Sequence, residues 1–119
     1  MINLKTVSRS FRHAFQGAVR VAKEEHNFRV ELVAAALIVV LMFVFDLQTV
    51  ERAILSLVIV LVLVLELVNS VFERMADMLK PRFHGLVGDV KDIMAATVLV
   101  SAVGAAVIGL LIFWPHIVK

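Results

Sequence analysis

Polar side chains recur along one face of an otherwise apolar stretch in the middle of the chain. Glu66, Asn69, Glu73 and Asp77 follow one another at intervals of three, four and four residues. At about 100° per residue, their directions on a helix fall within an arc of about 80°. A carboxylate within an apolar span costs about 2.5–3.5 kcal/mol on insertion scales, so it is expected to face a protein interior or a polar cleft.

Three aligned carboxylates and an amide predict a bound cation, most simply Mg²⁺, which is commonly held by one or two carboxylates together with substrate phosphates. The alternative is structural. Glu66 would then pair with an Arg or Lys of a neighbouring helix, while Glu73 and Asp77 would form the solvated end of their own helix.

Two further polar groups flank other apolar stretches. Glu24, Glu25 and Glu31 precede or begin the first stretch, where Glu25 is expected at a membrane depth similar to that of Glu73. The two could hold the same ions, or Glu24 and Glu25 could be a solvated loop. Lys91 and Asp92 open the last stretch. Lys91 could be only a cytoplasmic anchor, and Asp92 could be only a helix N-cap.

The composition indicates which elements position these residues. The chain has 119 residues, 61% of them apolar, and a mean hydropathy of +0.97. Ordinary soluble proteins are about 45–50% apolar, so an integral membrane protein is expected. The absence of cysteine excludes thiol catalysis and cysteine-based metal sites. A net charge of +2, with basic residues not interleaved with aromatic ones, argues against nucleic acid as a partner.

The apolar stretches predict an all-α integral membrane fold in a single domain over residues 1–119. Three transmembrane helices are expected, over residues 28–47, 53–75 and 92–114, and Pro115 is expected to close the third. Before them, residues 1–27 alternate apolar and basic positions at helical spacing and predict an amphipathic surface helix on anionic lipid. Its apolar positions are Leu4, Val7, Phe11, Phe15, Ala18 and Ala22.

Lys and Arg residues concentrate before the first span and between the second and third. By the positive-inside rule, the N-terminus and the 74–91 loop are expected in the cytoplasm. The basic residues concerned are Lys5, Arg9, Arg12, Arg20, Lys23, Arg29, Arg74, Lys80, Arg82 and Lys91.

These residues together resemble the signature of the prokaryotic diacylglycerol kinase family, which includes the undecaprenol kinases. The resemblance covers roughly residues 10 to 114. It rests on Glu66-x-x-Asn69-Ser70-x-x-Glu73-x-x-x-Asp77, on His84, on Lys91-Asp92 with Ala95-Ala96, and on Glu25-x-x-Phe28-Arg29-x-Glu31. The chain departs from the family pattern at Val71-Phe72, at Arg74 and at Ile93-Met94.

The resemblance implies a homotrimer in the bacterial cytoplasmic membrane that transfers the γ-phosphoryl group of ATP to a lipid hydroxyl, of diacylglycerol or undecaprenol. It implies that Glu66 is the catalytic base and that Glu25 and Glu73 hold Mg²⁺. Asn69 and Asp77 would support the nucleotide and metal site, and Lys91 with Asp92 would engage the nucleotide phosphates.

Size also favours an oligomer, because three helices from 119 residues can scarcely enclose ATP, a lipid head group and two metal ions. Two other functions remain open from the residues alone. One is a small oligomeric transporter or channel in which Glu66 binds a proton or cation. The other is a non-enzymatic membrane scaffold, which would leave Glu66 and Asn69 without a role.

Overall fold

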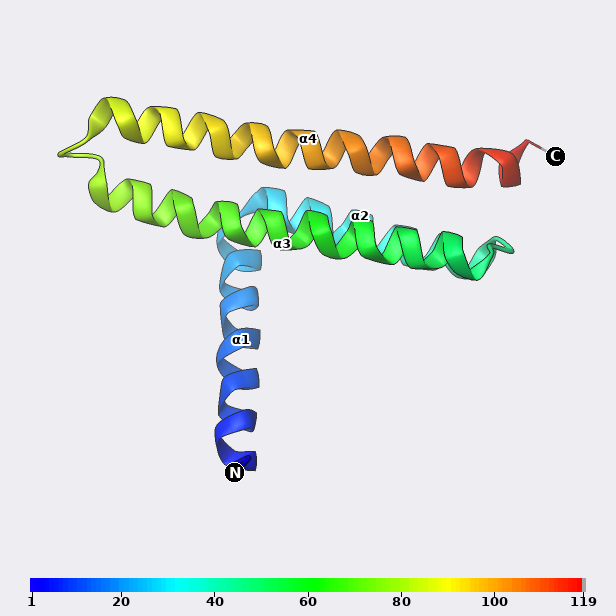
Figure 1. The fold of residues 1–119 in the computed structure, drawn as a ribbon, viewed down its shortest axis with the longest axis horizontal. Coiled ribbons are helices and arrows are strands. Elements are labelled where there is room, and N and C mark those ends of the chain that lie inside the picture. Colours follow the sequence, from blue (N-terminus) through cyan, green and yellow to red (C-terminus); the bar gives the residue numbers. More distant parts are fainter. Residues whose placement is uncertain (119) are drawn as a thin grey trace.

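Four helices make up the chain in a computed structural model that describes residues 1–118 (Figure 1). The helices are α1 (Leu4–Glu24), α2 (His26–Val44), α3 (Thr49–Leu79) and α4 (His84–Ile117). The last three are each long and apolar enough to cross a membrane. This confirms the expected all-helical fold with three helices suited to membrane spans.

The helix ends follow from local hydrogen bonds. Asn3 caps α1, where its side-chain oxygen accepts from the Lys5 backbone N–H at 3.0 Å. At the other end, Glu25 adopts an extended conformation that breaks the helix between α1 and α2. Arg29 then donates to the free carbonyls of Ala22 and Lys23, both at 2.9 Å. The α1–α2 junction is therefore a fixed corner rather than a loose link.

Helices α3 and α4 form an antiparallel pair joined by a tight turn (Figure 1). In this turn the backbone N–H groups of Arg82 and Phe83 both donate to Leu79, at 3.1 and 2.9 Å. At the opposite end of the bundle, Leu47, Leu55, Ile112 and Phe113 form a buried apolar cluster. This end ties α4 to the connection between α2 and α3.

The helices differ in length from the expected spans. Helix α2 ends at Val44, and Leu47 lies in the following connection, where it is buried. Helices α3 and α4 both extend to the turn that joins them, so α4 begins at His84. The expectation that Pro115 closes the last helix is wrong, because Pro115 lies inside α4, which continues to Ile117.

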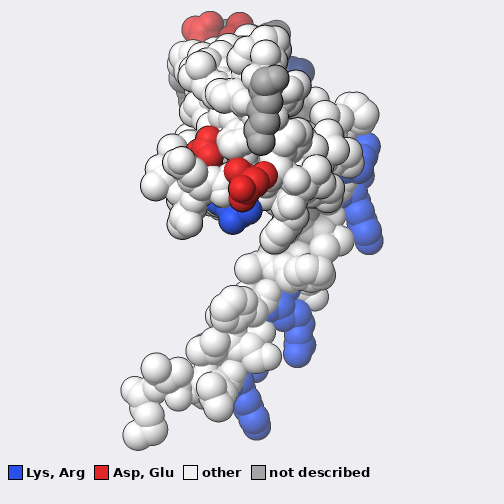
Figure 2. Space-filling view, turned by 90° about the vertical axis from the view of Figure 1, so that its right-hand side faces the viewer, with Lys and Arg blue, Asp and Glu red and all other residues white. Residues whose placement is uncertain are grey.

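Helix α1 projects sideways from the bundle, across the direction of α2, α3 and α4 (Figure 1). It meets the bundle partway along, so that α3 and α4 continue beyond the junction before they reach their connecting turn. Lys and Arg side chains lie along one side of this projecting helix (Figure 2). Phe11 and Phe15 are largely exposed on α1.

Candidate functional site

The polar face of α3 begins inside the bundle. Glu66 is 2% exposed and Asn69 is 7% exposed, although both lie in a helix whose other faces carry exposed Val and Leu. Asn69 Nδ2 donates to Glu73 Oε1 at 3.4 Å, one turn further along the helix. Glu73 is exposed, so the polar face runs from the interior of the bundle out to its surface.

Two more carboxylates approach this face from other parts of the chain. Glu25, at the corner between α1 and α2, and Glu73 both lie close enough to Glu66 for their charges to act on it. Glu66 in turn acts on Glu31 of α2. The structure therefore gathers Glu25 with Glu66 and Glu73, and the interpretation of Glu25 as part of a solvated loop is wrong. The corner holds its side chain at 20% exposure.

These acids have unused hydrogen-bonding capacity. Within residues 1–118, the Oε2 atoms of Glu25, Glu31 and Glu66 and the Oδ1 atom of Asn69 are buried without a hydrogen-bond partner. An unsatisfied buried polar group costs about 1–3 kcal/mol, and more when it is charged. No Lys, Arg or His of the described chain forms an ion pair with Glu66. The alternative in which Glu66 is neutralised by a neighbouring helix of the same chain is therefore not supported.

No group of three or more Asp, Glu or His side chains among the described residues has a geometry that could hold a metal ion. The donors are nevertheless of the right kind, because carboxylate oxygens suit Mg²⁺, and one or two of them suffice when a substrate supplies phosphate oxygens. Glu25 has a buried oxygen, Oε2, without a hydrogen-bond partner among the described residues, which is a donor of this kind.

Asp77 and Lys91 form a separate ion pair between α3 and α4. Lys91 Nζ lies 2.5 Å from Asp77 Oδ1, and both side chains are more than one-third exposed. Both residues lie beyond the apolar stretches of their helices. Because Lys91 hydrogen-bonds to Asp77, the pKa of the Asp77 carboxyl is lowered, and the same hydrogen bond raises the pKa of the Lys91 ammonium.

Asp92 belongs neither to the group of Glu25, Glu66 and Glu73 nor to the Asp77–Lys91 ion pair. It is exposed on α4, one position after Lys91. Its interpretation as a helix N-cap is wrong, because α4 begins at His84 and Asp92 lies well inside the helix.

Arg74 is a residue of the site that the sequence pattern did not single out beyond its positive charge and its departure from the family. Its Nη2 donates to Glu24 Oε2, and its Nη1 donates to Ser70 Oγ. Nη1 also lies 4.0 Å from Glu25 Oε1. The spacing of four residues from Ser70 was the available signal, since such pairs are neighbours on a helix.

An apolar groove lies between α2, α3 and α4, next to the acids. Glu31 is its only charged lining residue among those described, at the end nearest Glu66, and the groove continues toward the opposite end of the bundle. Small residues keep it open, and a Cβ atom added to Gly109 would meet nothing within 4 Å. Residues that line it include Ala35, Ile38, Val62, Ala105 and Gly109.

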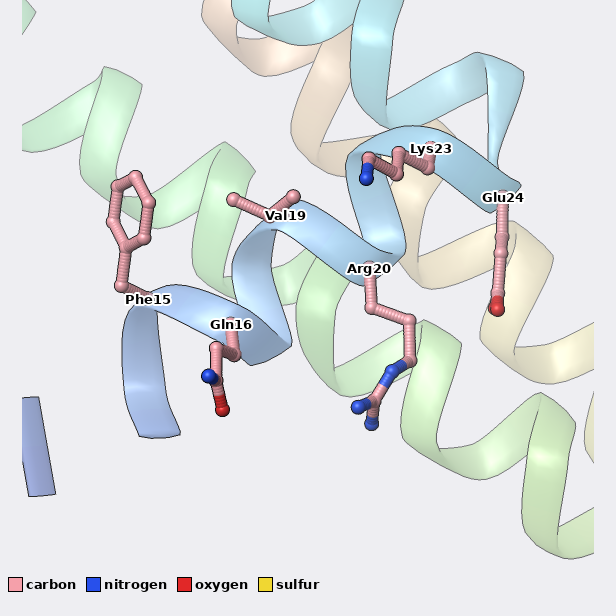
Figure 3. A pocket seen from close by; sticks show the side chains of 6 residues that line it. All are labelled: Phe15, Gln16, Val19, Arg20, Lys23 and Glu24. Atoms are coloured by element: carbon pink, nitrogen blue, oxygen red, sulfur yellow. The ribbon is translucent and has the colours of Figure 1, made fainter. Parts of the chain in front are cut away.

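A second, open groove lies along α1 itself (Figure 3). Phe15 stands at one end of it and Glu24 at the other, with Arg20 and Lys23 between them. All its lining residues belong to α1, so it is a surface furrow with apolar and basic side chains rather than an enclosed site.

Known proteins resemble this chain over most of its length. A model of the prokaryotic diacylglycerol kinase family matches residues 12–113. The undecaprenol kinase of Bacillus subtilis is 36% identical over 109 residues, covering 92% of this chain and 89% of the relative. The diacylglycerol kinase of Escherichia coli K12 is 33% identical over 92 residues, covering 77% of this chain and 75% of the relative.

A third relative, the diacylglycerol kinase of Synechocystis, is 30% identical over 101 residues, which are 84% of this chain and 58% of the relative. The matched region contains every one of the acids gathered at the site, together with the Asp77–Lys91 pair. The chain therefore belongs to the prokaryotic diacylglycerol kinase family and is a lipid kinase.

Proposed function

We propose that this kinase transfers the γ-phosphoryl group of ATP, bound with Mg²⁺, to the hydroxyl group of diacylglycerol or undecaprenol. The observation that carries the proposal is Glu66, a buried carboxylate without a cation partner in the described chain, placed beside Glu25 and Glu73 in a lipid-facing helix bundle. Membership of the family supports the reaction class.

Glu66 is the general base in this proposal. A lipid alcohol is a weak nucleophile, and a carboxylate within hydrogen-bond reach can accept its proton as the oxygen attacks the γ-phosphorus. The unpartnered Oε2 atom of Glu66 can accept that hydrogen bond. The proton then resides on Glu66, the bond between the γ-phosphorus and the β–γ bridging oxygen breaks, and ADP leaves with that oxygen.

Glu25 and Glu73 would hold Mg²⁺, whose chemistry is to neutralise the phosphate charge and orient the β- and γ-phosphates. Asn69 hydrogen-bonds to Glu73, so it would keep one oxygen of that carboxylate oriented. This arrangement needs no phosphate-binding loop, because positioning and charge neutralisation supply most of the catalysis in phosphoryl transfer.

Asp77, Lys91 and Asp92 would support the nucleotide from the parts of α3 and α4 nearest their connecting turn. Lys91 is the positively charged residue that would contact the nucleotide phosphates. Its ion pair with Asp77 gives its ammonium group a defined position. In the proposal, nucleotide phosphates would share the ammonium group with Asp77, and Asp92 would act from the next position on α4.

The apolar groove offers a place for the hydrocarbon chain of the acceptor. Glu31 marks its end near Glu66, so a lipid lying in the groove would bring its hydroxyl group toward the base. Apart from Glu31, the groove is lined by Ala, Val, Leu, Ile and Gly, and none of these distinguishes an acyl chain from a polyprenyl chain. Both lipids therefore remain acceptors in the proposal.

The proposal also includes an orientation in the bacterial cytoplasmic membrane. Helix α1 would lie in the cytoplasmic interface, with Phe11 and Phe15 in lipid and its basic side chains at anionic head groups. Its sideways projection from the bundle suits this placement (Figure 1). The N-terminus and the site would face the cytoplasm, and the working unit would be a homotrimer.

The test is phosphate transfer by the purified full chain. With Mg²⁺ and γ-labelled ATP in mixed micelles, label is expected in diacylglycerol or undecaprenol, and each lipid is supplied separately. Chelation of Mg²⁺ by EDTA should stop transfer, and re-addition of Mg²⁺ should restore it. Absence of label from both lipids under these conditions would overturn the proposal.

A further inference from the structure

Arg74 joins α3 to the corner between α1 and α2, at the edge of the group formed by Glu25, Glu66 and Glu73. It belongs to α3, where its guanidinium group folds back one turn to donate to the hydroxyl group of Ser70, which is completely buried. The other end of the same guanidinium group donates to Glu24, the last residue of α1. The planar fork of arginine allows both contacts at once, which a lysine ammonium could not reproduce with one geometry.

The contact holds the corner between α1 and α2 against α3. Glu25 is the corner residue itself, with extended backbone angles, and its position depends on where the corner sits. Arg74 Nη1 lies 4.0 Å from Glu25 Oε1, whereas Glu25 Oε2 is buried without a partner. One oxygen of Glu25 is thus near the guanidinium group, and the other has no hydrogen-bond partner among the described residues.

Few contacts tie α1 to α3. The helix projects away from the bundle and meets it only at its C-terminal end (Figure 1). Arg29 donates hydrogen bonds to the free backbone carbonyls at that end. Because Arg29 belongs to α2, these bonds stabilise the corner without linking it to α3. Among the ion pairs of the described residues, those of Arg74 are the ones that connect α3 to this corner.

We propose that Arg74 is a positioning residue that sets the Glu25 carboxylate against Glu66 and Glu73 by clamping the α1–α2 corner to α3. The inference rests on the proposed function, because it assigns a purpose to the placement of Glu25. It predicts that loss of Arg74 weakens divalent-cation binding and widens the range of α1 positions, with a smaller effect on the turnover number at saturating Mg²⁺.

Two substitutions break the clamp from opposite sides. Arg74→Gln removes the guanidinium group, and Glu24→Gln removes its charged partner from the exposed end of α1 without altering α3. Because both break one contact, the double variant should be little worse than either single variant. Arg74→Lys should recover part of the loss. Arg82→Gln, in the turn between α3 and α4, is the matched control for the loss of one positive charge.

The first measurement is divalent-cation binding by the full chain. Mn²⁺ is titrated in the presence of a non-hydrolysable ATP analogue and followed by electron paramagnetic resonance, and the Mg²⁺ concentration for half-maximal transfer is measured in parallel. Arg74→Gln and Glu24→Gln should raise both half-saturation points by about fivefold to tenfold, as expected for about 1–1.4 kcal/mol. Arg82→Gln should leave both within about twofold, a difference of about 0.4 kcal/mol.

The second measurement does not depend on activity. The chain has no cysteine, so spin labels can be placed selectively at Gln16→Cys on α1 and Met78→Cys on α3. Labelled chains are diluted with unlabelled ones, so that the measured distances lie within one chain. The distance distribution should be narrow with Arg74 and Glu24 present and broader in either clamp variant.

The outcomes separate this inference from the proposed function. If the unmodified chain transfers no phosphate, the proposed function fails, whereas the label distances still test the clamp. If the unmodified chain is active, and both clamp variants keep its Mn²⁺ binding and its label distances, the positioning role of Arg74 is overturned. A uniform fall in turnover without a change in cation binding would also overturn it.

Discussion

Lys91 Nζ lies 2.5 Å from Asp77 Oδ1 and so links α3 to α4 beyond their apolar stretches. The two residues are 14 positions apart in sequence but face each other because the helices are antiparallel and joined by a tight turn. The pair leaves the ammonium group exposed enough to be shared, since the Lys91 side chain is 37% exposed. This places a fixed positive charge on the same side of the bundle as the acids of α3.

Asp77→Asn tests whether the pair has a function beyond stability. Exposed ion pairs contribute about 0–1 kcal/mol, so the melting temperature should change little. If Asp77 positions Lys91 for the nucleotide, the KM for ATP should rise by about tenfold, which corresponds to about 1.4 kcal/mol. Steady-state kinetics with ATP as the varied substrate measures this. An unchanged KM would restrict Asp77 to a structural role.

Glu66→Gln removes the proposed base while keeping the size and most of the hydrogen-bonding groups of the side chain. Loss of a general base typically lowers the rate by about 10²–10⁴-fold, so turnover should nearly vanish. Nucleotide binding, measured by equilibrium dialysis, should persist. Glu51→Gln is the control, because it makes the same change in the same helix at the opposite end of the bundle. A Glu66→Gln protein that keeps wild-type turnover would remove Glu66 as the base.

Glu73→Gln should act on the metal dependence. Gln keeps an oxygen that can contact Asn69 but loses the negative charge, so the affinity for Mg²⁺ should fall. The expected rise in half-saturating Mg²⁺ is about tenfold or more, on the scale of about 10–100-fold known for changes at and around metal ligands. Transfer assays over a Mg²⁺ series measure it. If the unmodified chain and Glu73→Gln show the same dependence of transfer rate on Mg²⁺ concentration, Glu73 is excluded as a Mg²⁺ ligand.

Gly109→Leu tests the groove between α2, α3 and α4. A Cβ atom added to Gly109 meets nothing within 4 Å, and Gly109 lines the groove, so a larger side chain there is expected to occupy groove space. The KM for the lipid acceptor should rise by about tenfold, or about 1.4 kcal/mol, while the KM for ATP stays the same. Gly104→Leu is the matched control, because that glycine also has open space beside it but is exposed on α4.

Two outcomes would count against the groove as the acceptor site. One is an equal effect of both substitutions on the lipid KM. The other is loss of the oligomer, detected by chemical cross-linking, in Gly109→Leu alone. That result would show that the groove receives a helix of a second copy rather than a lipid chain.

Acid should weaken the end of the bundle opposite the site. Glu51, which precedes the apolar segment beginning at Ala53, accepts a hydrogen bond from the Gln48 backbone N–H at 2.9 Å and lies 3.4 Å from His116. The Gln48 N–H chiefly, and His116 in addition, lower the pKa of Glu51 below its ordinary value of 4.5. A lowered pKa in the folded state adds stability above pH 4.5, and this contribution is lost as the pH falls through the lowered value.

Thermal unfolding in micelles between pH 3 and pH 7 measures this contribution, with Glu51→Gln as the comparison. The unmodified chain should melt at a higher temperature than Glu51→Gln at pH 7, and the two should converge as the pH falls well below about 4.5. A difference that stays constant across this range would mean that the charge of Glu51 contributes nothing to stability.

Periodicity and hydropathy were sufficient for the architecture because a membrane helix must satisfy its backbone internally and cover itself with apolar side chains. The same periodicity placed Glu66, Asn69 and Glu73 on one face, and the structure buries or links them as that spacing implies. Asp92 failed as a helix cap because a sequence does not reveal where a helix begins when polar residues continue it past the membrane.

Contacts between elements were harder to predict. Whether Glu25 was solvated or buried depended on the corner between α1 and α2, where Arg29 of α2 and Arg74 of α3 bind residues at the end of α1. Arg74 looked like an ordinary positive-inside residue, since its partner Glu24 is 50 positions away in sequence. Such pairings arise from tertiary packing, and no local pattern encodes them.

The place where α1 meets the bundle has a consequence for the reacting lipid. Helix α1 meets the bundle partway along, short of the turn that joins α3 and α4 (Figure 1). Glu25 is the residue at this α1–α2 junction, and its charge acts on Glu66. If α1 lies in the membrane interface as proposed, the lipid alcohol would be phosphorylated while it remains in its leaflet. Its hydrocarbon tail would stay in the apolar region of the bilayer. The water-soluble nucleotide would bind between the ends of α3 and α4 that extend beyond the α1 junction.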